Sequence, residues 1–242
     1  MDAPLDQQRT LLELQTHDSA VDRLNHRRTS LPEHARLEQL ATNLAAIGQL
    51  VAERQGELAT VGREQTRFED EIEMVRRKAE SEEARAISGR VTSPKELTAI
   101  QEEVASLQRR QAALEDDLLE RMERRETLDA ELAELSSRRE GVAGDQAEVT
   151  KARDAALAEI DRELEVQRSA RKLLEPKVGD DLLKLYEQIR ARQGGIGAGA
   201  LVGNTCQGCR TSLSRVDVNA LRALPPERIK RCEHCRRILV VE

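Results

Sequence analysis

Residues 88–97 read SGRVTSPKEL, and this short stretch interrupts a helical pattern that extends on both sides of it. Gly89 can end a helix because glycine adopts left-handed backbone conformations without strain. Ser93 is a preferred N-cap residue, Pro94 suits the first position of a helix, and Glu96 has the spacing that closes a capping box. The stretch therefore predicts a turn that joins two helices.

Upstream of this turn, apolar side chains recur in heptads. Twelve of the fifteen seam positions are apolar over seven repeats, whereas three to four repeats already favour a coiled coil. The positions are Leu37, Leu44, Val51, Leu58, Gln65, Ile72, Ala79 and Ala86 on one seam and Leu40, Ile47, Arg54, Val61, Phe68, Val75 and Glu82 on the other.

Downstream of the turn, a second heptad series runs from Ile100 to Ala156, with a companion seam that includes several polar residues. Polar seam residues reduce stability but help to fix the register of the helices. One register places Gln65 opposite Arg121 and leaves Leu58 opposite Leu128. An antiparallel hairpin within one chain is the simplest interpretation, and a coiled-coil dimer between chains is the alternative.

A further helical segment, about 5–28, precedes the first arm and ends near Pro32, which disfavours an uninterrupted helix. Including this segment, the first arm matches the length of the second arm, which begins at Pro94. We therefore predict a kink near residues 30–33. Pro176 is expected to end the second arm, a short helix of about 178–192 follows, and the glycines of residues 194–199 read as a linker.

Two C-x-x-C motifs stand in the last forty residues or so and carry the chemistry of the chain. Zn²⁺ prefers four thiolates in a tetrahedron, and one tight turn can supply two of them. A segment this small also needs metal binding to fold. We therefore predict one structural Zn²⁺, bound by Cys206, Cys209, Cys232 and Cys235. Short strands are expected at 200–202 and 238–241. A helical turn is expected from Ser214 to Leu224, and Ser214 and Asp217 have the spacing that caps its start.

The composition argues against a compact enzyme. Charged residues make up 35% of the chain and aromatic residues 1%, which is typical of long helices with much exposed surface. The histidines have no evident nucleophile near them, so we expect no enzymatic activity and no small-molecule substrate. The sequence shows neither a signal peptide nor a membrane span, and we therefore expect a cytoplasmic protein, in which metal binding is favoured over disulfides.

Basic residues cluster around the second C-x-x-C motif and are the candidate contacts to a nucleic acid or another partner: Arg228, Lys230, Arg231, Arg236 and Arg237. Such a cluster can bind phosphates. It can equally be a solvated surface or dock onto an acidic coiled coil. The tail has no aromatic residue for base stacking, which weakens the case for single-strand recognition.

These motifs together resemble the bacterial C4-type zinc-ribbon proteins that carry an N-terminal coiled-coil hairpin, and actinobacterial members in particular. The similarity rests on residues 11–18, on residues 93–97 at the turn, on residues 186–190 and on the two C-x-x-C motifs. It implies an elongated hairpin, a zinc ribbon, and a role in binding the transcription machinery or nucleic acid. Arg236 stands where the family commonly has glycine after the last ligand.

We therefore predict a mostly α-helical protein with three parts. Residues 1–174 form a long, kinked antiparallel coiled-coil hairpin with its tip near residues 87–94. Residues 175–193 form a short connecting helix, and residues 194–242 form a small C-terminal zinc ribbon. The expected function is that of a non-enzymatic adaptor that binds proteins through the coiled coil and the ribbon, with a link to transcription or RNA. The alternative is a nucleic-acid-binding protein that uses the basic cluster of the ribbon.

Overall fold

The computed structural model describes residues 1–241, so that Glu242 of the predicted ribbon lies outside it. The chain divides into two compact units. The hairpin unit is Arg36–Val149, and the ribbon unit is Met1–Ala35 together with Thr150–Glu242. Within the described residues, none of the helices combines the length and apolar character that crossing a bilayer requires.

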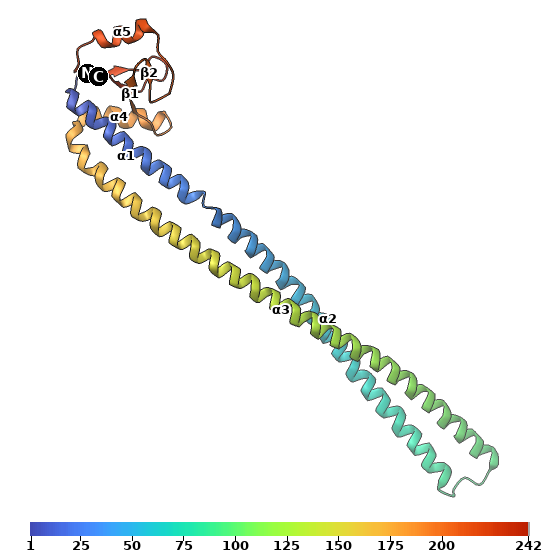
Figure 1. Ribbon diagram of the computed structural model, residues 1–242. Helices are drawn as coiled ribbons and strands as arrows, with labels where there is room; N and C mark the ends of the chain where they lie inside the picture. The colour runs from blue at the N-terminus through green and yellow to red at the C-terminus, as the bar shows by residue number, and fades with distance from the viewer. Residues whose placement is uncertain (242) are drawn as a thin grey trace. The chain divides into compact units, whose positions relative to one another are not determined.

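The hairpin unit is built from two helices, α2 (Pro32–Ile87) and α3 (Pro94–Val178), which continue into the ribbon unit. Residues 88–93 join them in a turn, which is the green tip of the hairpin in Figure 1. Gly89 has a positive φ of 72° there. Heptad residues face the partner arm, among them Val75, Ala79 and Leu107, which form one buried cluster. The predicted antiparallel coiled-coil hairpin is thus confirmed, with both arms in one chain.

Ion pairs link the two arms along the seam. Arg54 lies 2.5 Å from Glu131, and Arg121 lies 3.4 Å from Glu64. The buried Gln65 accepts a hydrogen bond from Arg125 at 3.2 Å, so its polar contact is one helical turn away from Arg121, the residue expected opposite it.

The helix start at Pro94 agrees with the sequence, but the predicted capping box differs. Glu96 binds Arg85 across the turn at 2.7 Å, and no side-chain bond of Ser93 occurs within residues 1–241. The reason is that the guanidinium offers the carboxylate a charged donor.

The ribbon unit contains α1 (Leu5–Thr29), the last part of α3, and α4 (Asp180–Arg192). Residues 30 and 31 separate α1 from α2. Leu11 and Leu14 of α1 pack with Val178, Leu182 and Tyr186 in the main core of this unit. A second cluster joins Leu24 and Leu31 to Ile160 and Leu164 of α3.

The sequence predicted that the second arm ends at Pro176, and this prediction was wrong. The helix α3 continues to Val178, and Gly179, with a φ of 83°, follows it. Pro176 lacks an N–H to bond the preceding turn and its ring crowds that turn, and the helix extends only two residues beyond it. The glycine then provides the left-handed conformation that turns the chain into α4.

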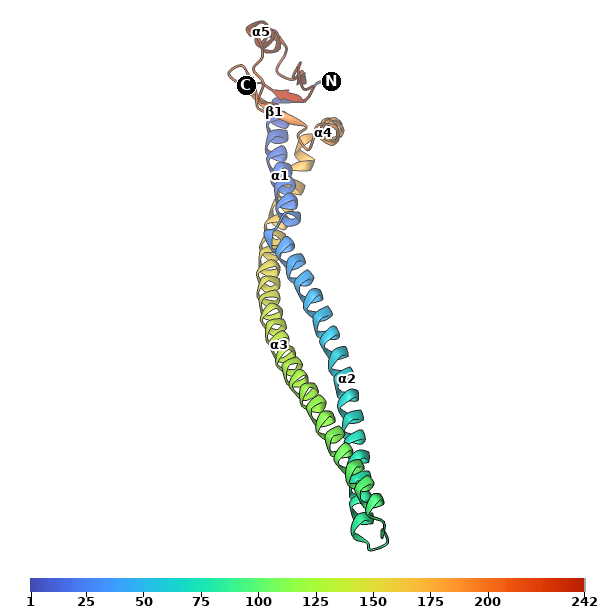
Figure 2. The same cartoon turned by 90° about the vertical axis from the view of Figure 1, so that its right-hand side faces the viewer.

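The strands form one small sheet in the order β2-β1-β4-β3, from β1 (Ala198–Val202), β2 (Thr205–Cys206), β3 (Lys230–Arg231) and β4 (Ile238–Val240). The central pair, β1 and β4, is parallel. The helix α5 (Arg215–Ala223) begins at Ser214 with the predicted capping box, in which Asp217 is the partner. Figure 2 shows β1 directly beside the N-terminal end of α1.

Candidate metal centre

The four cysteines converge at one end of the small sheet, where β2 and β3 both finish. Cys206 ends β2 and Cys232 follows β3, while Cys209 and Cys235 lie in the turns that come next. All four sulfur atoms lie within 4.8 Å of one another, and Cys209 Sγ and Cys232 Sγ are 3.9 Å apart. A tetrahedral Zn²⁺ with Zn–S bonds of about 2.3 Å needs sulfur atoms about 3.8 Å apart. The thiols therefore fit a four-thiolate zinc site.

The two C-x-x-C turns share one backbone hydrogen-bond pattern. Cys206 O accepts from Arg210 N at 2.7 Å, and Cys232 O accepts from Arg236 N at 2.8 Å. Cys206 N donates to Thr211 O, and Cys232 N donates to Arg237 O. The repeated geometry aims two thiols from each turn at a common centre.

Arginine takes the left-handed conformation after each pair of cysteines. Arg210 has a φ of 58° and Arg236 a φ of 61°, a region that favours glycine. Arg236, at the position where the family commonly has glycine, therefore adopts the conformation that glycine favours, at a cost of about 1 kcal/mol or more in backbone strain.

The first cysteine of each turn is buried and the second is half-buried. Burial raises the pKa of the Cys206 thiol to about 12 and also raises the pKa of Cys232. A hydrogen bond from the Thr211 side chain lowers the pKa of Cys209 to about 6. Two of the thiols must therefore release protons when zinc binds at neutral pH.

The predicted glycine linker is instead a tightly packed part of the fold. A Cβ atom at Gly199 would lie 2.5 Å from Gly208 N in the first cysteine turn, and one at Gly197 would lie 2.6 Å from the Tyr186 ring. Glycine is thus required where β1 passes both the metal turn and α4. The sequence predicted a linker here because glycine-rich composition is the same in a flexible linker and in a closely packed segment.

Two buried glutamines of α1 bind the ribbon. Gln15 Oε1 accepts from Gly197 N at 2.6 Å, and Gln15 Nε2 donates to Gly195 O at 3.1 Å. Gln8 Nε2 donates to Pro226 O at 3.0 Å in the loop before β3. Residues 1–3 pair with the same loop, where Ala3 N donates to Glu227 O at 2.7 Å. The N-terminal segment is therefore part of the ribbon's framework.

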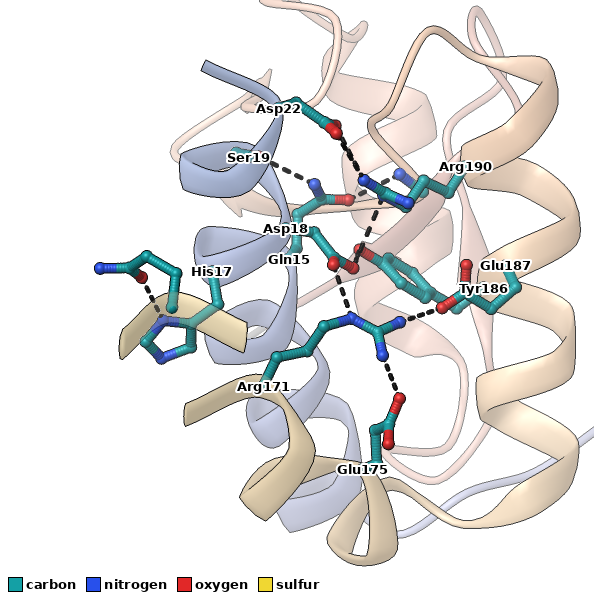
Figure 3. A network of polar contacts seen from close by, with 12 residues as sticks. Gln15, His17, Asp18, Ser19, Asp22, Arg171, Glu175, Tyr186, Glu187 and Arg190 are labelled. Carbon is teal, nitrogen blue, oxygen red and sulfur yellow. Dashed lines mark hydrogen bonds and ion pairs between the residues drawn. The ribbon is translucent and has the colours of Figure 1, made fainter. Parts of the chain in front are cut away.

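A polar network centred on Asp18 joins α1, α3 and α4 (Figure 3). Asp18 is 3% exposed, accepts from Arg171 at 2.6 Å and from the Tyr186 hydroxyl at 2.7 Å, and lies 3.6 Å from Arg190. Burial, together with the bond to Asp18, raises the pKa of Tyr186. Arg171 also binds Glu175 and Glu187. The network joins the three helices that carry the zinc ribbon, and the sequence predicted none of its polar contacts.

The basic cluster does not form one uniform surface. Arg228 pairs with Asp2 at 3.1 Å, and Lys230 is buried. Arg237 donates to Ile196 O and Gln193 O, so it holds the start of β1. Arg231 and Arg236 are exposed, and neither has a side-chain partner within residues 1–241.

Comparison with known proteins agrees with this division into a helical hairpin and a zinc ribbon. Residues 14–194 match the CT398-like coiled coil hairpin domain, and residues 205–239 match the C4-type zinc ribbon domain. The chain belongs to the CT398-like coiled-coil hairpin family. Its C-terminal part is a C4-type zinc ribbon. The cofactor is one structural Zn²⁺, as the four clustered cysteines predicted.

The similarity extends over the entire chain. An uncharacterized protein of Mycobacterium tuberculosis is 38% identical over 99% of this chain and 97% of its own length. A structure from Mycobacterium smegmatis has a TM-score of 0.88 with 36% identity and complete coverage of both chains. The CT398 structure from Chlamydia trachomatis has a TM-score of 0.74 at 19% identity, with 98% of each chain covered, and shows a shared fold. The resemblance to actinobacterial members is confirmed.

Proposed function

We propose that this protein is a non-enzymatic adaptor that binds protein partners through its coiled-coil hairpin and its zinc ribbon. The observation that carries this proposal is an open apolar pocket of about 270 Å³ at the hairpin tip. Ile87, 85% exposed, lines it with Ala86, Ile100 and Val104. A partner that covers these side chains would remove apolar area from water, which is the main driving force of protein association.

The metal centre supports a structural use of the zinc. Four thiolates complete a tetrahedral shell and leave no position for a substrate or an activated water. The buried carboxylate of Asp18 is already engaged by Arg171 and Tyr186. Both sites stabilise the base of the molecule, so neither supplies a free acid, base or nucleophile for catalysis.

The family resemblance suggests the transcription machinery as the class of partner, and we place the action of the adaptor in the cytoplasm. A long helical hairpin suits this role because it presents side chains on stiff elements that lose little conformational entropy on binding. The ribbon, bonded to α1 by Gln8 and Gln15, then offers a second rigid surface.

Nucleic-acid binding through the ribbon is the second candidate. It is favoured by the exposed and unpaired state of Arg231 and Arg236 within residues 1–241. Phosphate contacts of this kind weaken steeply with salt, by a slope of about −0.9 per phosphate neutralised on duplex DNA. Fewer residues can then contact a nucleic acid than the five basic residues predicted from the sequence, because Lys230 is buried and Arg237 binds the segment before β1.

The test uses the full chain as bait in nuclease-treated and untreated cell extract, followed by binding measurements with each purified partner. We expect a protein partner that survives nuclease and binds Ile87→Glu at least about tenfold more weakly, because the apolar contact is lost. Met74→Glu is the matched control, since Met74 is 63% exposed on the same unit. Two results together would favour the second candidate over the adaptor. All protein partners would be lost after nuclease treatment, and the chain would bind nucleic acid in a way that Arg231→Glu weakens.

A further inference from the structure

The outer face of α3 in the hairpin unit combines exposed apolar residues with acids that lack ionic partners. Leu119 is 56% exposed and Met122 is 45% exposed, and their spacing places them on one side of the helix. The same side carries Glu115, Asp116, Glu123 and Glu126, all of them exposed. We name these six residues the 115–126 face.

The arginines of this segment point the other way. Residues 115–126 hold six acidic residues and three arginines. Arg121 pairs with Glu64 at 3.4 Å, Arg124 with Glu57 at 2.5 Å, and Arg125 donates to Gln65. Each arginine of the segment therefore contacts a residue of α2, and Arg125 also lies 3.9 Å from Asp129 of α3.

The acids of the 115–126 face remain without ion pairs. Within residues 1–241, none of its four acids forms one, and Glu115 accepts only a hydrogen bond from Gln111. The surrounding unit adds to the negative field, because Arg36–Val149 holds 26 acidic and 17 basic residues, a formal charge of −9. Leu119 and Met122 are thus two neighbouring apolar side chains exposed within an acidic surface.

We propose that the 115–126 face docks a basic amphipathic helix of a protein partner. Leucine or isoleucine of that helix would cover Leu119 and Met122, and lysine or arginine on its flanks would meet Glu115, Glu123 and Glu126. The charge disfavours the other occupants, since a nucleic acid or an anionic membrane would be repelled, and a second copy would bring the same −9 hairpin. The inference rests on the proposed adaptor function and supplies a partner chemistry for it.

The test uses a synthetic helix of about three heptads with leucine on one face and lysine on the other, and a scrambled peptide of the same composition. Fluorescence anisotropy measures the affinity of each peptide for the zinc-loaded full chain. We expect the amphipathic peptide to bind at least about tenfold more tightly than the scrambled one, because only it can cover the apolar pair.

Matched variants separate docking from general charge attraction. Leu119→Lys is expected to weaken the amphipathic peptide about tenfold or more, and Met74→Lys, with the same charge change at a residue 63% exposed, less than about twofold. A second pair of variants neutralises three acids each. The loss of affinity for the amphipathic peptide should be larger for the variant on the 115–126 face, Glu115→Gln, Glu123→Gln and Glu126→Gln. It should be smaller for the control, which changes exposed acids elsewhere on the unit: Glu53→Gln, Glu69→Gln and Asp70→Asn. Circular dichroism confirms that each variant keeps its helices.

Equal losses in the two members of a pair, or no loss in either, would overturn the docking face. Self-association that Leu119→Lys abolishes would also overturn it, because the occupant would then be a second copy. These outcomes differ from failure of the adaptor function. That function fails when no protein partner is found for the full chain, whereas it persists without the 115–126 face if partners still depend on Ile87.

Discussion

The ribbon unit and the hairpin unit are stabilised in opposite ways. The ribbon unit concentrates its specific contacts in a few places: the four thiols, the packed glycines, and the buried network of Asp18. The hairpin unit repeats one modest contact many times, with heptad side chains in the seam and half-buried ion pairs beside it. Single changes should therefore damage the ribbon unit strongly and the hairpin unit weakly.

The largest expected effect is the loss of zinc affinity in acid. Because burial raises the pKa of Cys206 to about 12 and also that of Cys232, both thiols are protonated in the metal-free protein at neutral pH. Zinc binding must release at least these two protons, so its affinity should rise about 100-fold per pH unit near pH 7. Competition with a chromophoric chelator between about pH 6 and pH 8 measures the slope. An affinity independent of pH would contradict this assignment.

A glycine exchange compares the two units directly. Gly199→Ala places a methyl group 2.5 Å from Gly208 N and should destabilise the ribbon unit by about 1–3 kcal/mol, with weaker zinc binding. Gly48→Ala in α2 meets no atom within 4 Å and should stabilise the hairpin unit by about 0.5–1 kcal/mol, because alanine favours helix. Denaturant unfolding and zinc titration measure both, and a tolerated Gly199→Ala would remove the case for close packing there.

Tyr186→Phe tests the polar network at the base. The change removes a buried hydrogen bond to Asp18 and should reduce stability by about 1–3 kcal/mol. The raised pKa of Tyr186 means that the neutral phenol contributes fully below its ordinary pKa of about 10, and that this contribution is lost as the pH rises further. Thermal unfolding of both proteins between pH 8 and about pH 11 should show alkaline destabilisation that the variant lacks. An identical pH profile would mean that the phenol plays no such part.

The smallest effect is expected in the hairpin unit. Arg124→Gln removes the pair with Glu57 at 2.5 Å, but both side chains are 41% exposed. Solvent screening then leaves about 0.2–1 kcal/mol. Urea unfolding in low and high salt measures it, and a loss well above this range would show that individual ion pairs, rather than the seam, hold the arms together.

The sequence predicted the periodic and the chemically distinctive parts of this molecule. Heptads specify which side of a helix is buried, and two C-x-x-C motifs restrict the metal and its coordination, so the hairpin and the zinc ribbon followed from the residues alone. The capping box of Ser214 and Asp217 was also predicted, because it depends only on neighbours three residues apart.

Contacts between distant residues could not be predicted in this way. Gln15 binds Gly197 and Asp18 binds Tyr186 across 182 and 168 residues, and no periodicity relates such positions. The glycines at 197 and 199 and the two roles of the basic cluster depend on the same long-range packing. A signal did exist: Gln15, Asp18 and Tyr186 lie in the motifs that carried the family resemblance, although a resemblance names no contacts.

The most direct test of this account is hydrogen–deuterium exchange of the full chain with and without a strong zinc chelator, beside a measurement of bound metal. We predict one zinc per chain. On chelation, protection should disappear from residues 198–240 and fall where α1 binds them, at Gln8 and Gln15, while the hairpin unit Arg36–Val149 stays protected. Purified protein without stoichiometric zinc, or a ribbon equally protected after chelation, would contradict it.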